Sequence, residues 1–233
     1  MFEWGNAAFD SLGPPNARCL AVTQTAMGLV NYAFTKIEPS ALKPDSWAAM
    51  AFEAAERGEI TLQQARGLIL DYVGPSLDTT IFAISSAIWL FALHPKQWTL
   101  LCENPASIPG AINEVLRIES PIQTFSRYVT RDTEVDGVAL PQGSRALVMY
   151  GSANRDERKW QEPKPFDIQR KAAEQLAFGH GEHLCVGLPL PRLEIRALLA
   201  ALARRVKRFE ILELNRGINN TLRGLETLKM AVR

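Results

Sequence analysis

Apolar residues recur at helical spacing through the first half of the chain, and clusters of proline and glycine divide this pattern into segments. Within residues 1–60 the breaks fall at Gly13–Pro15 and between Pro39 and Pro44. Apolar side chains three or four positions apart share one face of a helix, so these residues are predicted to form helices separated by two loops. No chemical motif is visible among them.

The longest apolar segment extends from Leu62 to Leu93 and ends before a His-Pro dipeptide. Thr61 is followed three positions later by Gln64, which is the arrangement of a capping box at the start of a helix. The segment therefore predicts one helix of roughly 33 residues. Because this helix is apolar nearly all round, it is expected to run through the middle of the protein.

A proline interrupts this apolar segment. Pro75 has no N–H to donate to the carbonyl of Asp71, so the helix is expected to kink or widen there and to leave backbone acceptors free. Asp78, Thr79 and Thr80 follow shortly afterwards and form the polar group of an otherwise apolar segment.

The remaining elements are predicted from the same kinds of pattern. Two shorter helices are followed by alternating segments that suggest a small sheet, an irregular stretch, an amphipathic helix beginning immediately after Cys185, and a tail of strands and turns. The two helices are Pro95–Asn104 and Ser107–Glu119, and the alternating segments lie within residues 123–150. The irregular stretch is residues 151–175, the amphipathic helix is the segment LEIRALLAALARRV, and the tail is residues 209–233.

Composition is typical of a soluble globular protein. The 233 residues are 47% hydrophobic and 22% charged with a formal net charge of +1, which gives no overall attraction to nucleic acid or to an anionic membrane. Three widely spaced cysteines without a CxxC pair favour a reducing compartment, and the N-terminus lacks the features of a signal peptide. The apolar stretch Ile81–Leu93 is shorter than the roughly 20 residues of a membrane span. We expect a cytoplasmic protein with neither nucleic acid nor membrane as a partner.

The stretch FGHGEHLCVG, Phe178 to Gly187, is the densest group of chemically informative residues. A zinc site would use His180, His183 and Cys185, but the spacing is cramped and no second ligand cluster completes a tetrahedral site. A structural turn around a buried cysteine explains neither the glycines nor the helix expected next. One thiolate, a glycine-rich loop open to a large flat group, and a helix start that stabilises the thiolate favour the fifth ligand of a haem iron.

These residues resemble the cysteine signature of the cytochrome P450 family, Phe-x-x-Gly-x-(Arg or His)-x-Cys-x-Gly. The resemblance implies a mainly α protein with the cytochrome P450 fold, of which this chain is the C-terminal portion: a long central helix, a helix bundle, a small β-sheet and the cysteine loop. It implies Cys185 as the metal ligand. The cofactor-binding residues that it implies are Arg127, Phe178, Gly179, Gly181, His183, Cys185 and Gly187.

Three further segments resemble family motifs in the same order along the chain. PSLDTT resembles the acid and alcohol of the central helix, which implies Asp78 and Thr79 as catalytic residues in proton delivery. Glu114-x-x-Arg117 resembles the family's Glu-x-x-Arg pair and implies a structural role, although alone it would be an ordinary pair on a helix surface. SRYVTRDTEVDGVALPQG resembles the sheet segment whose arginine, here Arg127, meets a haem propionate, and His183 would meet a propionate too.

Three residues depart from the family pattern. Where relatives carry small residues before the acid, this chain has Pro75 and Ser76, and Ser76 would either crowd the pocket or add a hydrogen-bond donor. Pro165 stands where many relatives carry the third member of a Glu-Arg-Arg cluster. That place is left to Arg155, to Arg170 or to neither.

By the resemblance, residues 1–233 are expected to form a single cytochrome P450 domain lacking its N-terminal portion. The implied function is that of a haem-thiolate monooxygenase, which inserts one oxygen atom from O2 into an apolar small molecule. Its cofactor would be haem b, and its electrons would come from a ferredoxin or a flavodoxin. A haem-binding relic without turnover and a zinc-binding structural protein remain as alternatives.

Overall fold

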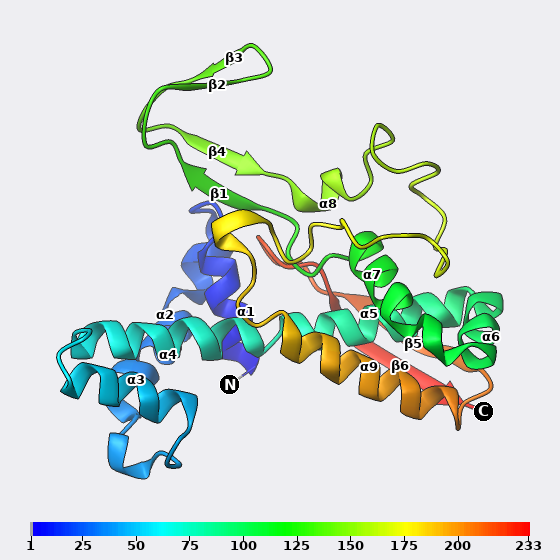
Figure 1. The fold of residues 1–233 in the computed structure, drawn as a ribbon, viewed down its shortest axis with the longest axis horizontal. Coiled ribbons are helices and arrows are strands. Elements are labelled where there is room, and N and C mark those ends of the chain that lie inside the picture. The colour runs from blue at the N-terminus through cyan, green and yellow to red at the C-terminus, as the bar shows by residue number, and fades with distance from the viewer. Residues whose placement is uncertain (1) are drawn as a thin grey trace. The chain divides into compact units, whose positions relative to one another are not determined.

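The computed structural model describes residues 2–233, and the elements can be followed by colour in Figure 1. Helices dominate and the strands are few, which confirms the mainly α fold expected from the sequence. The chain divides into two compact units, Met1–Ile81 and Phe82–Arg233, and each is described by itself. The single domain stays a prediction.

The first unit consists of helices, as the spacing of apolar residues predicted. Its helices are α1 Phe2–Ser11, α2 Ala17–Asn31, the π-helix η1 Tyr32–Lys36, the 3₁₀-helix η2 Pro39–Ala41, α3 Trp47–Glu56 and α4 Leu62–Ser76. The core between α3 and α4 is made of Ala51, Phe52, Ala65 and Ile69. The predicted capping box starts α4: the Thr61 hydroxyl accepts from the Gln64 N–H at 3.1 Å, and Gln64 Oε1 accepts from the Thr61 N–H at 2.8 Å.

The flaw predicted near Pro75 is confirmed, and it divides the helix expected from Leu62 to Leu93 into two. Helix α4 ends at Ser76, and α5 begins at Thr79 and extends to Leu93. The cause is Pro75, which cannot donate an N–H within the helix. The turn after it tightens, with the Leu77 N–H donating to the carbonyl of Gly74 at 3.3 Å, and the carbonyl of Pro75 accepts the Thr79 hydroxyl at 2.8 Å instead.

The segment is only partly buried in this chain. In α4 the buried residues are Ala65, Ile69 and Gly74, whereas Leu62 and Leu68 are 54% and 43% exposed. By length and composition alone, Leu62–Leu93 could cross a membrane, a property that the core helix of a soluble protein shares.

The second unit packs helices around a shared apolar core. Its helices are α5 from Phe82 onward, α6 Pro95–Glu103, the 3₁₀-helix η3 Pro105–Ser107, α7 Ile108–Ile118, α8 Tyr150–Ala153, the 3₁₀-helix η4 Gly181–His183 and α9 Pro189–Ala203. Phe91 of α5, Trp98 of α6, Leu116 of α7 and Leu199 of α9 belong to one buried cluster. Helices α6 and α7 thus confirm the two shorter helices that the sequence predicted.

The strands form paired ribbons rather than the one small sheet expected between residues 123 and 150. Strand β1 Phe125–Tyr128 pairs with β4 Arg145–Val148, β2 Thr133–Val135 pairs with β3 Val138–Leu140, and β5 Phe209–Arg216 pairs with β6 Leu225–Val232, all antiparallel. The turn between β2 and β3 has positive φ at Asp136 (49°) and Gly137 (78°). This is the combination that a two-residue type I′ hairpin requires, so the Asp-Gly pair sets this register.

The last helix begins later than predicted. Residues 186–188 form a turn, and α9 starts at Pro189 rather than directly after Cys185. Both Pro189 and Pro191 lie in its first turn, where the missing N–H groups have no partner within the helix to lose. The prolines therefore fix the start of α9 four residues beyond the sulfur.

We expect Gly224→Ala to destabilise the protein by about 1–3 kcal/mol, because an added methyl must displace a packed ring. A Cβ at Gly224 would lie 2.2 Å from Cγ of Phe82. The matched control is Gly110→Ala in α7, where the new Cβ would lie 3.5 Å from the Ile168 carbonyl and helix propensity favours alanine by about 1 kcal/mol. Urea unfolding measures both variants, and equal stabilities would contradict the packing argument.

Candidate functional site

The cysteine loop has a fixed backbone and an exposed sulfur. The Cys185 N–H donates to the carbonyl of Phe178 at 2.9 Å, and the Leu184 N–H donates to that of Gly181 at 3.0 Å. These bonds fold the predicted signature back on itself. Cys185 is a free thiol on the surface of this loop. The side chain is therefore presented rather than buried, which excludes the structural turn around a buried cysteine.

Two of the loop's glycines have backbone conformations that other residues rarely adopt. Gly179 has φ +73° and Gly181 has φ +68°. A Cβ on Gly179 would also lie 3.2 Å from the carbonyl oxygen of His183, which is tighter than ordinary contact. At Gly187 a Cβ would meet the Cys185 sulfur at 3.8 Å, an ordinary contact distance. Gly179 and Gly181 are thus required by the loop, whereas Gly187 keeps the approach to the sulfur open.

Arg127 reaches the same loop through Tyr150, a residue that sequence reasoning missed. Arg127 lies on β1, and its Nη2 donates to the Tyr150 hydroxyl at 2.9 Å. That hydroxyl lies 3.9 Å from where a Cβ of Gly179 would stand. Tyr150 follows a strand-like run of apolar residues, so nothing in the local pattern marked it as a contact between β1 and the loop.

The residues of this loop fit the haem that the resemblance implies. The thiol of Cys185 is exposed, and the apolar side chains on either side of it, Leu184 and Val186, are 50% and 81% exposed. His183 is exposed on the same loop and Arg127 lies beside this loop, so two basic side chains are available to bind carboxylates. A soft sulfur ligand, an apolar surface and basic groups are the chemistry that a carboxylate-bearing iron porphyrin needs.

The zinc alternative finds no support in the described part of the chain. Within residues 2–233 no three His, Cys, Asp or Glu side chains gather closely enough to hold a metal ion. A structural zinc site needs four ligands in tetrahedral arrangement. The thiol of Cys185 is therefore left as a single soft ligand.

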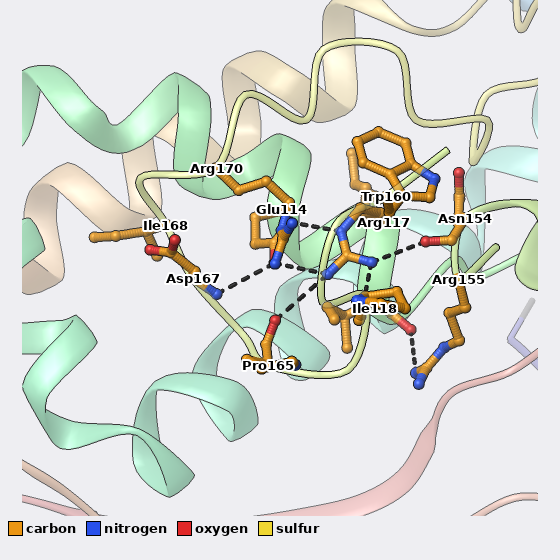
Figure 2. Close-up of polar contacts among 12 residues, drawn as sticks. Glu114, Arg117, Ile118, Asn154, Arg155, Trp160, Pro165, Asp167, Ile168 and Arg170 are labelled. Carbon is orange, nitrogen blue, oxygen red and sulfur yellow. Dashed lines mark hydrogen bonds and ion pairs between the residues drawn. The ribbon is translucent and has the colours of Figure 1, made fainter. Parts of the chain in front are cut away.

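Glu114 and Arg117 form a fully buried ion pair on α7 (Figure 2). Arg117 Nε lies 2.7 Å from Glu114 Oε2, Arg117 Nη2 lies 2.8 Å from Glu114 Oε1, and both side chains are 0% exposed. The remaining N–H groups of Arg117 donate to the carbonyls of Asn154 at 2.8 Å, Pro163 at 2.9 Å and Pro165 at 3.5 Å. The ring of Trp160 lies 5.4 Å from the guanidinium carbon. Arg117 thereby holds three points of the irregular segment that precedes the cysteine loop.

Arg170 takes the third place in this cluster, and Arg155 does not. Arg170 Nε lies 3.2 Å from Glu114 Oε1, which also accepts the Asp167 N–H at 3.2 Å, as Figure 2 shows. Arg155 instead donates to the carbonyl of Ile118 at 2.7 Å. The sequence left these two arginines as alternatives, and their side-chain positions decide between them.

Asn154 connects the buried pair to the cysteine loop. It is 0% exposed, its Nδ2 donates to the Ser120 hydroxyl at 2.9 Å, and its Oδ1 accepts the Leu176 N–H at 2.7 Å. The carbonyl of Leu176 in turn accepts the Gly179 N–H at 2.9 Å. The sequence analysis did not single out Asn154, so its role became visible through its contacts.

Asp78 and Thr79 lie in the first unit, at the break between α4 and α5. Asp78 is 5% exposed, its Oδ2 has no hydrogen-bond partner among the described residues, and burial raises its pKa from 3.8 to about 6. A Cβ on Gly5 of α1 would lie 2.7 Å from that oxygen. The Ser76 hydroxyl donates to the carbonyl of Val73 at 2.8 Å, so Ser76 is engaged within its own helix. The proton-delivery role of the pair stays a prediction.

Comparison with known proteins agrees with this geometry. Residues 108–225 match the family model for Cytochrome P450. The chain is 37% identical over 229 residues to cytochrome P450 CYP199A2 of Rhodopseudomonas palustris, covering 98% of this chain and 56% of that protein. It is 31% identical over 206 residues to 6-deoxyerythronolide B hydroxylase of Saccharopolyspora erythraea, covering 87% and 51%. The solved structure of cytochrome P450 CREJ superposes with a TM-score of 0.90 at 27% identity, over 99% of this chain and 60% of that one.

The chain therefore belongs to the cytochrome P450 family. Family membership implies haem as the cofactor. The chain spans about half the length of the curated relatives it matches, 56% of the first and 51% of the second.

We expect Glu114→Ala to lower the free energy of unfolding by about 3–5 kcal/mol, because it leaves Arg117 charged and buried without its carboxylate. The control is Glu53→Ala, which removes a carboxylate that lies 54% exposed and 4.0 Å from Arg57, and which should cost less than about 0.5 kcal/mol. Urea unfolding compares the two. A Glu114→Ala protein as stable as Glu53→Ala would remove the structural role.

The raised pKa of Asp78 predicts that stability falls as pH rises. Its folded pKa of about 6 lies above the unfolded value near 3.9, so its contribution is fully present below about pH 4 and is lost as pH rises through 6. Asp78→Asn should abolish this dependence. Its stability relative to wild type should rise by about 2 kcal/mol between pH 4.5 and 7.5 in urea unfolding. Asp71→Asn, on an exposed position of α4, is the control, and the same gain there would contradict the assignment.

Proposed function

We propose that this chain is the haem-thiolate part of a monooxygenase that inserts one oxygen atom from O2 into an apolar organic substrate. The observation that carries the proposal is the exposed thiol of Cys185, held by the bond from its N–H to Phe178 and by the left-handed glycines Gly179 and Gly181. The matched relatives include a protein named as a hydroxylase, which supports the same class of reaction.

The proposed cofactor is haem b. Cys185 would bind the iron through its thiolate, and Arg127 and His183 would bind the propionates. The loop offers its one cysteine to the metal and carries no CxxCH sequence for covalent attachment, which favours the unattached b type. When bound, the haem supplies the activation of O2 that the protein side chains alone do not provide. Phe178 would cover the sulfur side of the loop, where the guanidinium of Arg192 lies 5.5 Å from its ring.

The reaction consumes two electrons and two protons, because one oxygen atom enters the substrate C–H bond and the other leaves as water. Asp78 is suited to move the protons, since a pKa of about 6 lets it change protonation near neutral pH. The hydroxyl of Thr79 donates to the carbonyl of Pro75 at 2.8 Å and so is held at the helix break beside that carboxyl. We assign the two residues to proton delivery.

The electron donor proposed for this chain is a ferredoxin or a flavodoxin, and the proposed location is the cytoplasm. Both rest on the resemblance to bacterial members of the family and on the composition of the chain. The substrate is an apolar small molecule. We assign its contacts to residues 73–76 of α4 and to residues 121–125, which lead from α7 into β1.

We expect Cys185→Ser to abolish the red-shifted Soret band of the reduced, carbon monoxide-bound protein, since that band requires thiolate ligation. Cys19→Ser and Cys102→Ser are the controls and should keep it, because neither residue belongs to the loop. The measurement is made on protein purified with haem. Retention of the band in Cys185→Ser would remove the iron assignment.

A further inference from the structure

Three arginines converge on one buried carboxylate at the end of α7, away from the Glu114 cluster. Glu119 caps the helix and is 2% exposed. Its Oε2 lies 2.8 Å from Arg216 Nη1 and 3.0 Å from Arg223 Nε, and its Oε1 lies 3.6 Å from Arg155 Nη2. Arg216 is the last residue of β5, Arg223 lies two residues before β6, and Arg155 lies in the turn after α8. Four segments of the second unit thus meet at a single carboxylate.

The charge at this point does not balance. Three guanidinium groups and one carboxylate give 3 − 1 = +2, and arginine stays protonated in proteins. The other carboxylates on β5 and β6 contact other side chains: Glu213 pairs with Lys229, Glu210 pairs with Arg233 at 3.0 Å, and Glu226 accepts from the side-chain amide of Asn215 at 3.0 Å. Among the described residues, Glu119 is the carboxylate in ion-pair contact with Arg155, Arg216 and Arg223, so these four side chains together carry the surplus.

The three arginine side chains are held in place and are partly exposed to solvent. Their side chains are 43%, 27% and 38% exposed for Arg155, Arg216 and Arg223. Arg216 lies over the ring of Trp89 at 5.0 Å, and Arg155 donates to the carbonyl of Ile118 at 2.7 Å. An arginine oriented by a ring or a carbonyl loses less conformational entropy when it binds a ligand. The cluster has the preorganised donors and the access of a binding site.

We propose that Arg155, Arg216 and Arg223 form a binding site for a small oxyanion, a phosphate dianion or a monophosphate group. The surplus of two charges matches a dianion. Arg223 Nε and Nη2 are bonded to Glu119 at 3.0 and 3.2 Å, so the anion would bind the arginine N–H groups that Glu119 leaves free, and such donors suit tetrahedral oxyanions better than chloride. The buried Glu119 orients the arginines from below, and the bound anion completes the neutralisation from the solvent side. The site is independent of Cys185 and of the proposed reaction.

The test titrates the full chain with sodium phosphate at pH 8, with ionic strength held constant by sodium chloride. Thermal unfolding and ³¹P line broadening report binding. We expect a saturable rise in Tm with phosphate and none with chloride. Arg155→Gln should weaken phosphate binding roughly tenfold, because one unit charge near the anion is lost. Arg158→Gln, which removes an arginine that is 89% exposed and paired with Asp156, is the control and should bind as wild type does.

Glu119→Gln should change the phosphate affinity in the opposite direction to Arg155→Gln. This outcome separates the proposed binding site from a merely structural cluster. It raises the surplus from two charges to three, so phosphate binding should strengthen by roughly tenfold. A purely structural role predicts destabilisation without tighter binding. Phosphate that acts no differently from chloride, or equal losses in Arg155→Gln and Arg158→Gln, would overturn the site. If Glu119→Gln does not fold, the Arg155→Gln and Arg158→Gln pair decides alone by ³¹P line broadening.

Discussion

The buried ion pair between Glu114 and Arg117 is the constraint on which the second unit depends. A fully buried, charged guanidinium needs a partner for each of its donors. Arg117 finds these partners in the carboxylate of Glu114 and in the carbonyls of Asn154, Pro163 and Pro165. An irregular segment without strands or helices is thereby fixed as firmly as a regular element. Since this segment leads into the cysteine loop, the geometry around the sulfur depends on a pair that takes no part in the chemistry.

Three buried carboxylates in this chain show how surroundings give one functional group three behaviours. Glu114 is matched by Arg117 and Arg170, and its remaining contact is the N–H of Asp167. Glu119 is surrounded by more positive charge than it can neutralise. Asp78 has no cationic partner among the described residues, so desolvation by burial acts alone and raises its pKa to about 6. The first suits a structural role, the second leaves a capacity for anions, and the third suits proton movement near neutral pH.

The loop around Cys185 combines a rigid backbone with an open surface. Left-handed glycines and the hydrogen bond to Phe178 hold the sulfur in position, and Tyr150 places Arg127 beside the same loop. The exposed side chains of Leu184 and Val186 give the surface around the sulfur an apolar character. The loop is thus prepared for a large apolar group with carboxylates before that group binds, which keeps the cost of reorganisation on binding low.

Local sequence alone determined the helices, the Asp136-Gly137 turn, the capping box and the cysteine signature, because each depends on residues within a few positions of one another. It also marked Pro75 as a flaw, but the length of the break depended on backbone contacts such as the bond from the Leu77 N–H to the carbonyl of Gly74. Only the tertiary structure decided that Arg170 rather than Arg155 joins Glu114, that Tyr150 and Asn154 connect distant segments, and that three arginines share Glu119. Those contacts join residues 22 to 104 positions apart, and side-chain packing, not local propensity, chooses among the candidates at such separations.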